Sequence, residues 1–199
     1  DTGDMTTQKM LGHLPMLLSA KARNVAIIGL GSGVTAGAAL QYPIASLDAV
    51  EISPEVVEAS TAFDAVNGRP LLDRRTHLRV VDGRAHLHLT SQRYDVIVSE
   101  PSNPWVSGVS GLFTDEFYQR IRTYLTPNGV FGQWLHLYEI DDALVLSVIK
   151  AVHKNFPSYR IYLTADVDVL IVASNQPEFP EPDWSVYGLP NIQVDLKRF

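Results

Sequence analysis

The chain has 199 residues, of which 46% are hydrophobic and 19% are charged, and its formal net charge is -6. This composition excludes disordered and fibrous proteins and fits one globular domain with a short additional layer. The absence of cysteine excludes disulfide scaffolds, Cys-ligated zinc and thiol nucleophiles. The acidic balance argues against nucleic acid as a partner. No apolar run reaches the roughly 20 residues of a membrane-spanning helix, so we expect no direct membrane contact.

Helical and strand patterns alternate along the chain. Apolar residues at three- and four-residue steps predict a helix over residues 5–20, which Pro15 would bend or divide. Short apolar runs predict strands over residues 24–28, 46–52, 77–81, 94–99, 130–135, 159–163 and 167–173. Helices are expected over residues 34–42, from Ser53 onward, and over residues 113–125 and 141–155, with a turn at residues 127–129.

Buried strands that alternate with helices predict an α/β fold with a doubly wound, mostly parallel sheet. Too few residues separate the last two strands for a crossover helix, so this pair should form a C-terminal antiparallel hairpin. The seven strands follow the plan of class I methyltransferase-like folds, which are Rossmann-like. We divide the chain into an N-terminal helical lead-in (1–23), a nucleoside-binding catalytic domain (24–174) and a Pro-rich tail (175–199) that packs on the domain or extends from it.

Glycine and acidic residues follow four of the predicted strands. Ligands of an open parallel sheet bind at the carboxyl ends of its strands. The first strand is followed by Gly29-Leu30-Gly31-Ser32-Gly33, and the second ends in Glu51. Asp82-Gly83 follows the third strand, and Glu100 follows the fourth. These neighbouring strand ends are the strongest functional signal in the sequence.

The glycine loop permits a tight turn and brings backbone N–H groups to a ligand, although such turns also occur without one. Glu51 lies 20 residues beyond Gly31, where an acid can accept both hydroxyls of a ribose, and this spacing favours a nucleoside. Val34 occupies the third glycine position of a dinucleotide fold, so the loop has the G-x-G-x-G form of S-adenosyl ligands. Asp82 can accept from an adenine amine, cap the next helix, or do both.

The segment Glu100-Pro101-Ser102-Asn103-Pro104 is the candidate reaction site. Its prolines stiffen the chain, which would hold Glu100 and Asn103 toward the ligand, whereas the alternative is a turn in which Asn103 bonds its own backbone. Residues 105–112, which begin with Trp105, form either a lid over the site or an irregular loop. The histidines are scattered, so no metal site is predicted.

These motifs resemble the spermidine synthase family of polyamine aminopropyltransferases over residues 4 to about 174. Residues 3–11 look like the family's D-x-x-x-Y-Q-E-M segment. The other matching segments are residues 25–33, 50–52, 82–83, 100–104, 111–118 and 133–135. The pattern is closest to members with the loop G-L-G-S-G and the strand end S-E-P-S-N-P-W, some of which are fused to membrane-spanning segments. Because the first residue is Asp1 rather than Met, we expect the chain to be part of such a longer protein.

The resemblance implies transfer of an aminopropyl group from decarboxylated S-adenosylmethionine to a polyamine amine. The implied nucleoside-binding residues are Gln8, Gly29, Gly31, Ser32, Gly33, Glu51, Asp82 and Gly83. Glu100 would be catalytic, because the attacking amine must be neutral and deprotonating it costs about 4 kcal/mol at pH 7. Glu100, Asn103 and Trp105 would bind the acceptor, and no metal is implied.

The departures from the family all concern substrate recognition. Ser32 replaces an Asp that neutralises the amine of the decarboxylated ligand, and Asn103 replaces a substrate-binding Asp. Thr7 occupies a position where the family has a tyrosine, and the stretch between the last two strands lacks the family's pocket tyrosine. Two alternatives therefore stay open: a methyltransferase that uses intact S-adenosylmethionine on an unknown acceptor, and a noncatalytic module of a larger membrane protein. We expect a small-molecule amine partner and a cytoplasmic location, or the cytosolic part of a membrane protein, with a homodimer as one assembly to test.

Overall fold

The computed structural model describes the chain except residues 1, 20, 103–107, 139, 166 and 198–199. The strands are β1 (Asn24–Ile28), β2 (Ser46–Glu51), β3 (Thr76–Val80), β4 (Tyr94–Ser99), β5 (Leu125–His136), β6 (Ser158–Ala165) and β7 (Asp168–Ser174). The helices are α1 (Thr2–Leu18), α2 (Val34–Ala39), α3 (Pro54–Ser60), α4 (Asp64–Asn67), α5 (Gly83–Leu89), α6 (Asp115–Tyr124), α7 (Asp142–Asn155) and α8 (Pro190–Leu196).

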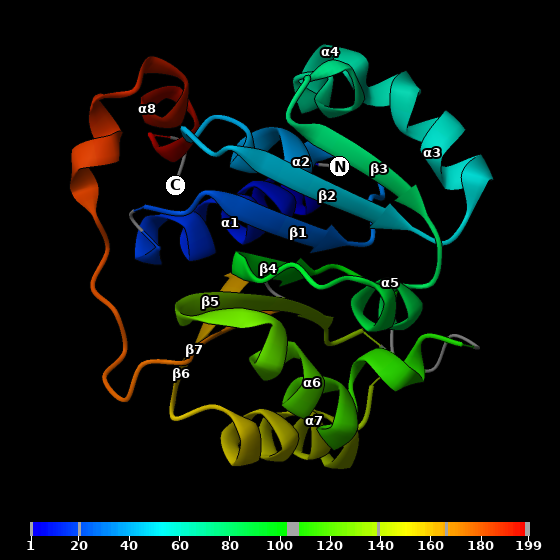
Figure 1. Ribbon diagram of the computed structural model, residues 1–199, viewed down its shortest axis with the longest axis vertical. Helices are drawn as coiled ribbons and strands as arrows, with labels where there is room; N and C mark the ends of the chain where they lie inside the picture. Colours follow the sequence, from blue (N-terminus) through cyan, green and yellow to red (C-terminus); the bar gives the residue numbers. More distant parts are fainter. Residues whose placement is uncertain (1, 20, 103–107, 139, 166, 198–199) are drawn as a thin grey trace.

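One sheet joins the described strands in the order β3-β2-β1-β4-β5-β7-β6 (Figure 1). Strands β1 to β5 pair in parallel, and β7 runs antiparallel to both β5 and β6. The predicted seven-stranded, mostly parallel α/β sheet with a C-terminal antiparallel hairpin is confirmed. Because β7 is antiparallel, its first residues lie at the same edge of the sheet as the carboxyl ends of β1, β4 and β5.

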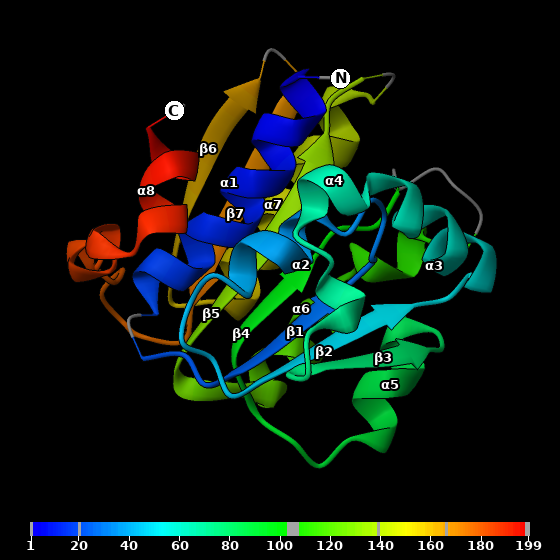
Figure 2. The same ribbon diagram turned by 90° about the horizontal axis from the view of Figure 1, so that it is seen from above.

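Helices cover both faces of the sheet (Figures 1 and 2). Alternate residues of one strand supply the two cores, since Ile97 packs in one and Val96 and Val98 in the other. Helices α5, α6 and α7 cover the Ile97 face, and α1, α2 and α8 cover the opposite face. The strand ends are therefore held between two packed layers, which fixes the loops that leave them.

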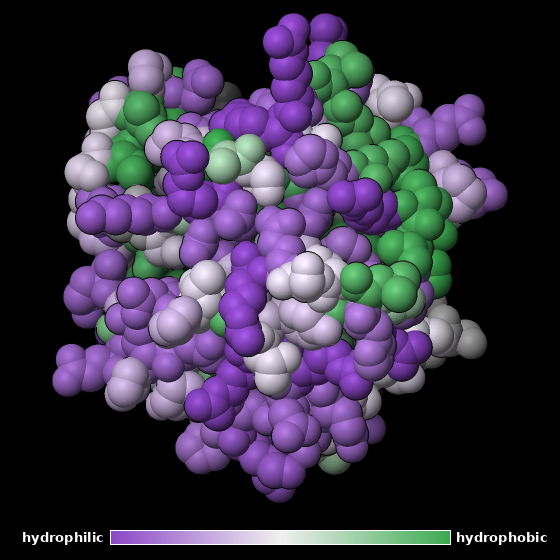
Figure 3. All heavy atoms as spheres, viewed as in Figure 1, coloured by the Kyte–Doolittle hydropathy of each residue, from purple (hydrophilic) through white to green (hydrophobic). Residues whose placement is uncertain are grey.

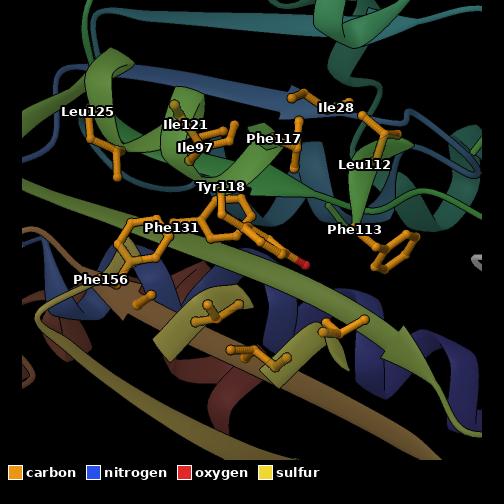
Figure 4. Close-up of a cluster of buried hydrophobic side chains, with 14 of the residues drawn as sticks. Ile28, Ile97, Leu112, Phe113, Phe117, Tyr118, Ile121, Leu125, Phe131 and Phe156 are labelled. Atoms are coloured by element: carbon orange, nitrogen blue, oxygen red, sulfur yellow. The ribbon is translucent and has the colours of Figure 1, made fainter. Parts of the chain in front are cut away.

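Aromatic rings fill the core between the sheet and helices α6 and α7 (Figure 4). Phe131 of β5 stacks on Phe156 with ring centroids 5.7 Å apart, and Tyr118 of α6 meets Phe131 edge-on at 5.9 Å. Such pairs add roughly 0.5–1.5 kcal/mol to the stabilisation from buried area. The burial of this part of β5 anchors the end of the strand that leads to the site.

Short polar side chains begin several of the helices. Ser53, Thr114 and Asp141 each accept a hydrogen bond from the backbone N–H three residues later, as N-cap residues do. Ser53, from which the sequence predicts a helix, is thus the N-cap of α3. These caps set where each helix starts after its strand, and so they set the length of the connecting loops.

Several predicted boundaries differ from the structure. Pro15 does not divide α1, which runs unbroken through it. The turn predicted at residues 127–129 lies inside β5, where the register with β4 shifts between Tyr94 and Val96, so the strand begins earlier than expected. Helix α2 ends at Ala39, and the Pro-rich tail contains α8, which the sequence analysis did not predict.

Strand β3 forms one edge of the sheet, and most of it is exposed. Apolar side chains gather beside it over α3, α4 and the ends of β2 and β3 in the space-filling view (Figure 3). Exposed apolar residues of this region include Ile52, Val66 and Val80. In the described part of the chain, no helix is both long and apolar enough to cross a membrane.

Candidate active site

The glycine loop after β1 adopts a conformation that requires glycine. Gly29, Gly31 and Gly33 have φ values of 93°, 51° and 79°, in the left-handed region that other residues rarely adopt. A Cβ atom on Gly29 would lie 2.3 Å from the backbone oxygen of Glu100. The loop after β1 therefore packs directly on the chain that leaves β4, and the two predicted site segments are neighbours.

Glu51 holds the glycine loop in place. Its Oε2 accepts a hydrogen bond from the backbone N–H of Leu30 at 2.9 Å, and its Oε1 accepts one from that of Ser53 at 3.0 Å. The residue is 8% exposed. A carboxylate has about four lone-pair positions, so these two bonds leave capacity for the hydroxyls of a ribose. The sequence did not indicate that Glu51 also shapes the loop.

Gln8 reaches the loop from α1. Ser32 Oγ donates to Gln8 Oε1 at 2.7 Å, and Thr35 Oγ1 donates to the Gln8 backbone oxygen at 3.1 Å. On the other side of the loop, Asn67 Nδ2 donates to the Ser32 backbone oxygen at 2.9 Å. The structure thus brings Gln8 and Ser32 together, although the two are far apart in the sequence.

Asp82 caps α5, as one of its two predicted roles requires. Its Oδ1 accepts a hydrogen bond from the backbone N–H of Ala85 at 3.0 Å. Among the described residues, Oδ2 accepts no hydrogen bond, which leaves it free for a ligand. Gly83 packs on β1, because a Cβ there would lie 2.5 Å from Ile28 Cγ2. Gly83 is therefore a packing requirement between β1 and α5.

Glu100 lies between the glycine loop and the neighbouring strands. Its backbone N–H donates to the Ile28 oxygen at 2.8 Å, and its Oε1 lies 4.0 Å from the Cβ position of Gly31. Its Oε2 is buried and has no hydrogen-bond partner in the described part of the chain. Burial raises the pKa of Glu100 to about 8, with the nearby Thr35 hydroxyl opposing that shift. An orphaned buried carboxyl oxygen fits a site that receives a cationic ligand.

A small cavity of ≈ 60 Å³ opens beside Glu100. Three elements supply its walls besides Glu100: the first turns of α1 and the ends of β5 and β7. The lining residues are Asp4, Thr7, Gln8, Leu11, Glu100, Trp134 and Asp168. Three of these side chains carry carboxyl groups, so the cavity suits a positively charged group rather than an anion.

Asp168 lines this cavity and is a candidate site residue that the sequence analysis missed. It is 3% exposed. Thr7 Oγ1 donates to its Oδ2 at 2.7 Å, and Trp134 Nε1 and His136 Nδ1 lie 3.0 and 2.7 Å from its Oδ1. Burial alone raises the pKa of Asp168, but the hydrogen bonds from His136, Thr7 and Trp134 outweigh burial and lower that pKa. Asp168 is therefore an ionised carboxylate in the cavity wall.

Asp168 is recognised as a neighbour of Trp134 and His136 only from the pairing of β5 with β7. His136 stands opposite Asp168 in that antiparallel register, and Trp134 lies on the same face of β5. A Trp-x-His pattern at a strand end was the available signal. Without the register, nothing in the sequence connects that pattern to an acid more than 30 residues later.

Two predicted site residues, Asn103 and Trp105, lie outside the described residues. Of the lid or loop predicted over residues 105–112, the structure describes residues 108–112, which include a short 3-10 helix, Ser110–Leu112. Within the described ranges, no cluster of three or more metal-ligating side chains was found. A larger hollow of ≈ 440 Å³ lies between α2, α4 and α8, but none of the strand-end acids lines it.

The sequence family described as "Spermine/spermidine synthase domain" matches residues 4–176. A polyamine aminopropyltransferase of Agathobacter rectalis is 29% identical over 165 residues, which cover 81% of this chain and 58% of that protein. A polyamine aminopropyltransferase of Bacillus mycoides is 29% identical over 189 residues, which cover 91% of this chain and 65% of that protein. The chain thus spans 58–65% of the length of these two curated relatives.

Solved structures share the fold. A spermidine synthase in complex with the transition state analogue AdoDATO has a TM-score of 0.80 at 24% identity, over 98% of this chain and 76% of that one. Human methyltransferase-like protein 13 in complex with SAH has a TM-score of 0.69 at 20% identity, over 99% of this chain and 92% of that one. These likenesses show the methyltransferase-like fold, and the sequence match over residues 4–176 shows the family. The chain belongs to the spermine/spermidine synthase domain family.

Proposed function

We propose that this chain transfers an aminopropyl group from decarboxylated S-adenosylmethionine to the amine of a polyamine. The observation that carries the proposal is the position of Glu100, which borders the glycine loop on one side and the acidic cavity on the other. The two relatives described above are named polyamine aminopropyltransferases, which supports the same reaction. The predicted nucleoside site and the cavity for a cationic amine thus meet at one carboxyl group.

In this proposal the nucleoside lies along the strand ends. The glycine loop offers backbone N–H groups, Glu51 accepts from the ribose hydroxyls and Asp82 Oδ2 accepts from the adenine amine. Gln8 of α1 closes this site through the hydrogen bond that it accepts from Ser32 of the glycine loop. With the base at the end of β3 and the ribose at the end of β2, the sulfonium lies toward Glu100 at the end of β4.

The amine attacks the methylene carbon beside the sulfonium. Its nitrogen lone pair forms the new C–N bond, and the C–S bond breaks with its electron pair going to sulfur, which leaves as a neutral thioether. The sulfonium already activates the carbon, so the protein's work is alignment and removal of one proton from the acceptor ammonium. Glu100 takes that proton and passes it to solvent.

Glu100 becomes a carboxylate when its cationic ligands bind. In the free protein its pKa of about 8 keeps it protonated at neutral pH. A sulfonium and an ammonium nearby stabilise the charged form, which lowers the pKa and releases the proton. The empty site thus avoids an unpaired buried charge, and the loaded site acquires the base that the reaction needs.

The test is a turnover assay on the purified chain with decarboxylated S-adenosylmethionine and putrescine, analysed by mass spectrometry. The proposal expects methylthioadenosine and spermidine in equal amounts, with a loss of at least about 100-fold for Glu100→Gln. The same assay with intact S-adenosylmethionine is run in parallel. S-adenosylhomocysteine as the only product would show a methyltransferase instead. Tight nucleoside binding without any turnover would show a binding module.

The proposal includes three further expectations about the protein. They are a cytoplasmic location, a homodimer, and fusion of this chain to membrane segments in a longer protein. Each follows from the sequence resemblance. The homodimer is testable on the purified chain by light scattering, which would give twice the monomer mass of 22.0 kDa.

A further inference from the structure

Asp168 keeps one acceptor position open toward the cavity. Its Oδ1 accepts from both Trp134 Nε1 and His136 Nδ1, whereas among the described residues its Oδ2 accepts only from the Thr7 hydroxyl. A carboxylate has about four lone-pair positions, so one remains on Oδ2. Since Asp168 lines the cavity and is nearly inaccessible from outside it, that position is available to a group inside the cavity.

We propose that Asp168 is the specificity residue of the acceptor site and binds the second ammonium group of a di- or polyamine. This inference rests on the proposed aminopropyl transfer. The first amine of the acceptor stands at Glu100 and attacks the donor carbon. The second, which stays protonated throughout, is held at Asp168 by a charge-assisted hydrogen bond.

The order of the strands favours the acceptor over the donor as the source of this ammonium. Along the edge of the sheet lie the glycine loop after β1, then Glu100 after β4, Trp134 on β5 and Asp168 on β7. Two inter-strand spacings, roughly 10 Å, separate β4 from β7. A donor bound on the glycine loop reaches Glu100 first. Asp168 lies beyond Glu100, on the side where a second molecule must enter.

The cavity wall between Glu100 and Asp168 suits a methylene chain. Leu11 and Trp134 line the cavity together with Glu100 and Asp168. One water needs ~10–15 Å³, so the ≈ 60 Å³ cavity holds about four to six groups of that size. That is enough for an ammonium with a short alkyl chain, and too little for a nucleoside.

Thr7, Trp134 and His136 act as positioning residues in this arrangement. Each comes from α1 or β5, and their three hydrogen bonds fix the Asp168 carboxylate in one orientation and keep it ionised. A protonated acid at this place would donate a hydrogen bond and could not receive one from an ammonium. The hydrogen-bonded setting therefore suits selection by charge.

The experiment compares Asp168→Asn with Asp195→Asn. Asp195 is the matched control, because it is also buried, contacts three donor side chains (Lys9, His13 and Gln41), and does not line the cavity. Both variants are assayed with putrescine, a diamine, and with butylamine, which has the same carbon chain but only one amine. Decarboxylated S-adenosylmethionine is titrated into each variant by calorimetry.

The proposal expects Asp168→Asn to raise KM for putrescine at least about tenfold, with butylamine and nucleoside affinity unchanged. Asp195→Asn should leave the preference for putrescine over butylamine as in the wild type. Equal losses for both amines would mean that Asp168 is only structural and would overturn the inference. Weakened binding of the nucleoside would assign Asp168 to the donor ammonium and would overturn it too.

A direct measurement covers the case in which Asp168→Asn does not fold. Crystals of the wild type with methylthioadenosine and putrescine should show one nitrogen within hydrogen-bond distance of Asp168 Oδ2. Density that places both nitrogens away from Asp168 would reject the inference. If the wild type makes no spermidine at all, the proposed function itself fails, and the two failures are thereby distinguished.

Discussion

Gly29 and Glu100 meet at the ends of β1 and β4 so closely that a Cβ on Gly29 would lie 2.3 Å from the Glu100 backbone oxygen. The contact joins the loop that we assign to the nucleoside with the residue that we assign to proton transfer. Any displacement of one segment moves the other. In the proposed reaction, the geometry therefore depends on a position that carries no side chain.

Gly29→Ala should destabilise the protein by about 2–4 kcal/mol, from left-handed backbone strain plus a clash with backbone that cannot move aside. Gly68→Ala is the matched control, because Gly68 has a similar φ of 73° and no atom within 4 Å of its Cβ position. Gly68→Ala should lower the free energy of unfolding by the backbone strain alone, about 1–2 kcal/mol. Urea unfolding of both variants measures the difference, and equal losses would contradict the packing argument.

Glu51→Ala should abolish nucleoside binding, because the change removes both the predicted ribose acceptor and the hydrogen bond to Leu30 that holds the loop. Calorimetry with methylthioadenosine gives the affinity. Glu55→Ala serves as the control, since Glu55 is an exposed acid bonded to Ser53 on the neighbouring helix. Wild-type affinity in Glu51→Ala would refute the ribose assignment.

The stability of the free protein should fall as pH rises from about 4.5 to about 8. The folded pKa of Glu100 is about 8, against 4.5 for an unperturbed group, so in this window the folded state binds more protons than the unfolded state. The slope contributed by this one group reaches about 1.4 kcal/mol per pH unit. Urea unfolding across this range should show the slope in the wild type and its loss in Glu100→Gln.

The same pKa predicts proton release on ligand binding. A cationic ligand favours ionised Glu100, so affinity should rise with pH up to about 8 and then level off. Calorimetry of decarboxylated S-adenosylmethionine in buffers of different ionisation enthalpy counts the protons released. Glu100→Gln should show no release from this group. A pH-independent affinity in the wild type would mean that the ligand does not reach Glu100.

Ser32→Asp should sharpen the preference for the decarboxylated donor. Ser32 sits in the glycine loop against Gln8, and a carboxylate there would attract the donor's free amine and repel the carboxylate of intact S-adenosylmethionine. We expect the affinity ratio of the two ligands to change by about tenfold. Ser32→Asn has nearly the same shape without the charge and should leave the ratio unchanged. A similar change in both variants would point to shape rather than charge.

The positions of the strand-end acids were predictable from the sequence because the signals are local. Glu51 and Glu100 each follow a run of buried residues, and the spacing between Gly31 and Glu51 is read along the chain. The start of β5 was not predictable, because it depends on the pairing of Leu125 with Tyr94, and residues 126–129 lie where the register with β4 shifts. Helix α8 escaped prediction because prolines dominate the tail, and the burial of Ile192 supplies what local propensity lacks.

The sequence by itself determined the α/β alternation, the sheet class and the four strand ends at which we propose the site, because hydrophobic periodicity and glycine content act over a few neighbouring residues. The tertiary structure alone decided which distant side chains share the cavity. Gln8 meets Ser32 only because α1 packs on α2, and Asp168 meets Trp134 only through the β5–β7 register. Register and helix docking arise from the packing of the whole core, so no single segment of the chain specifies them.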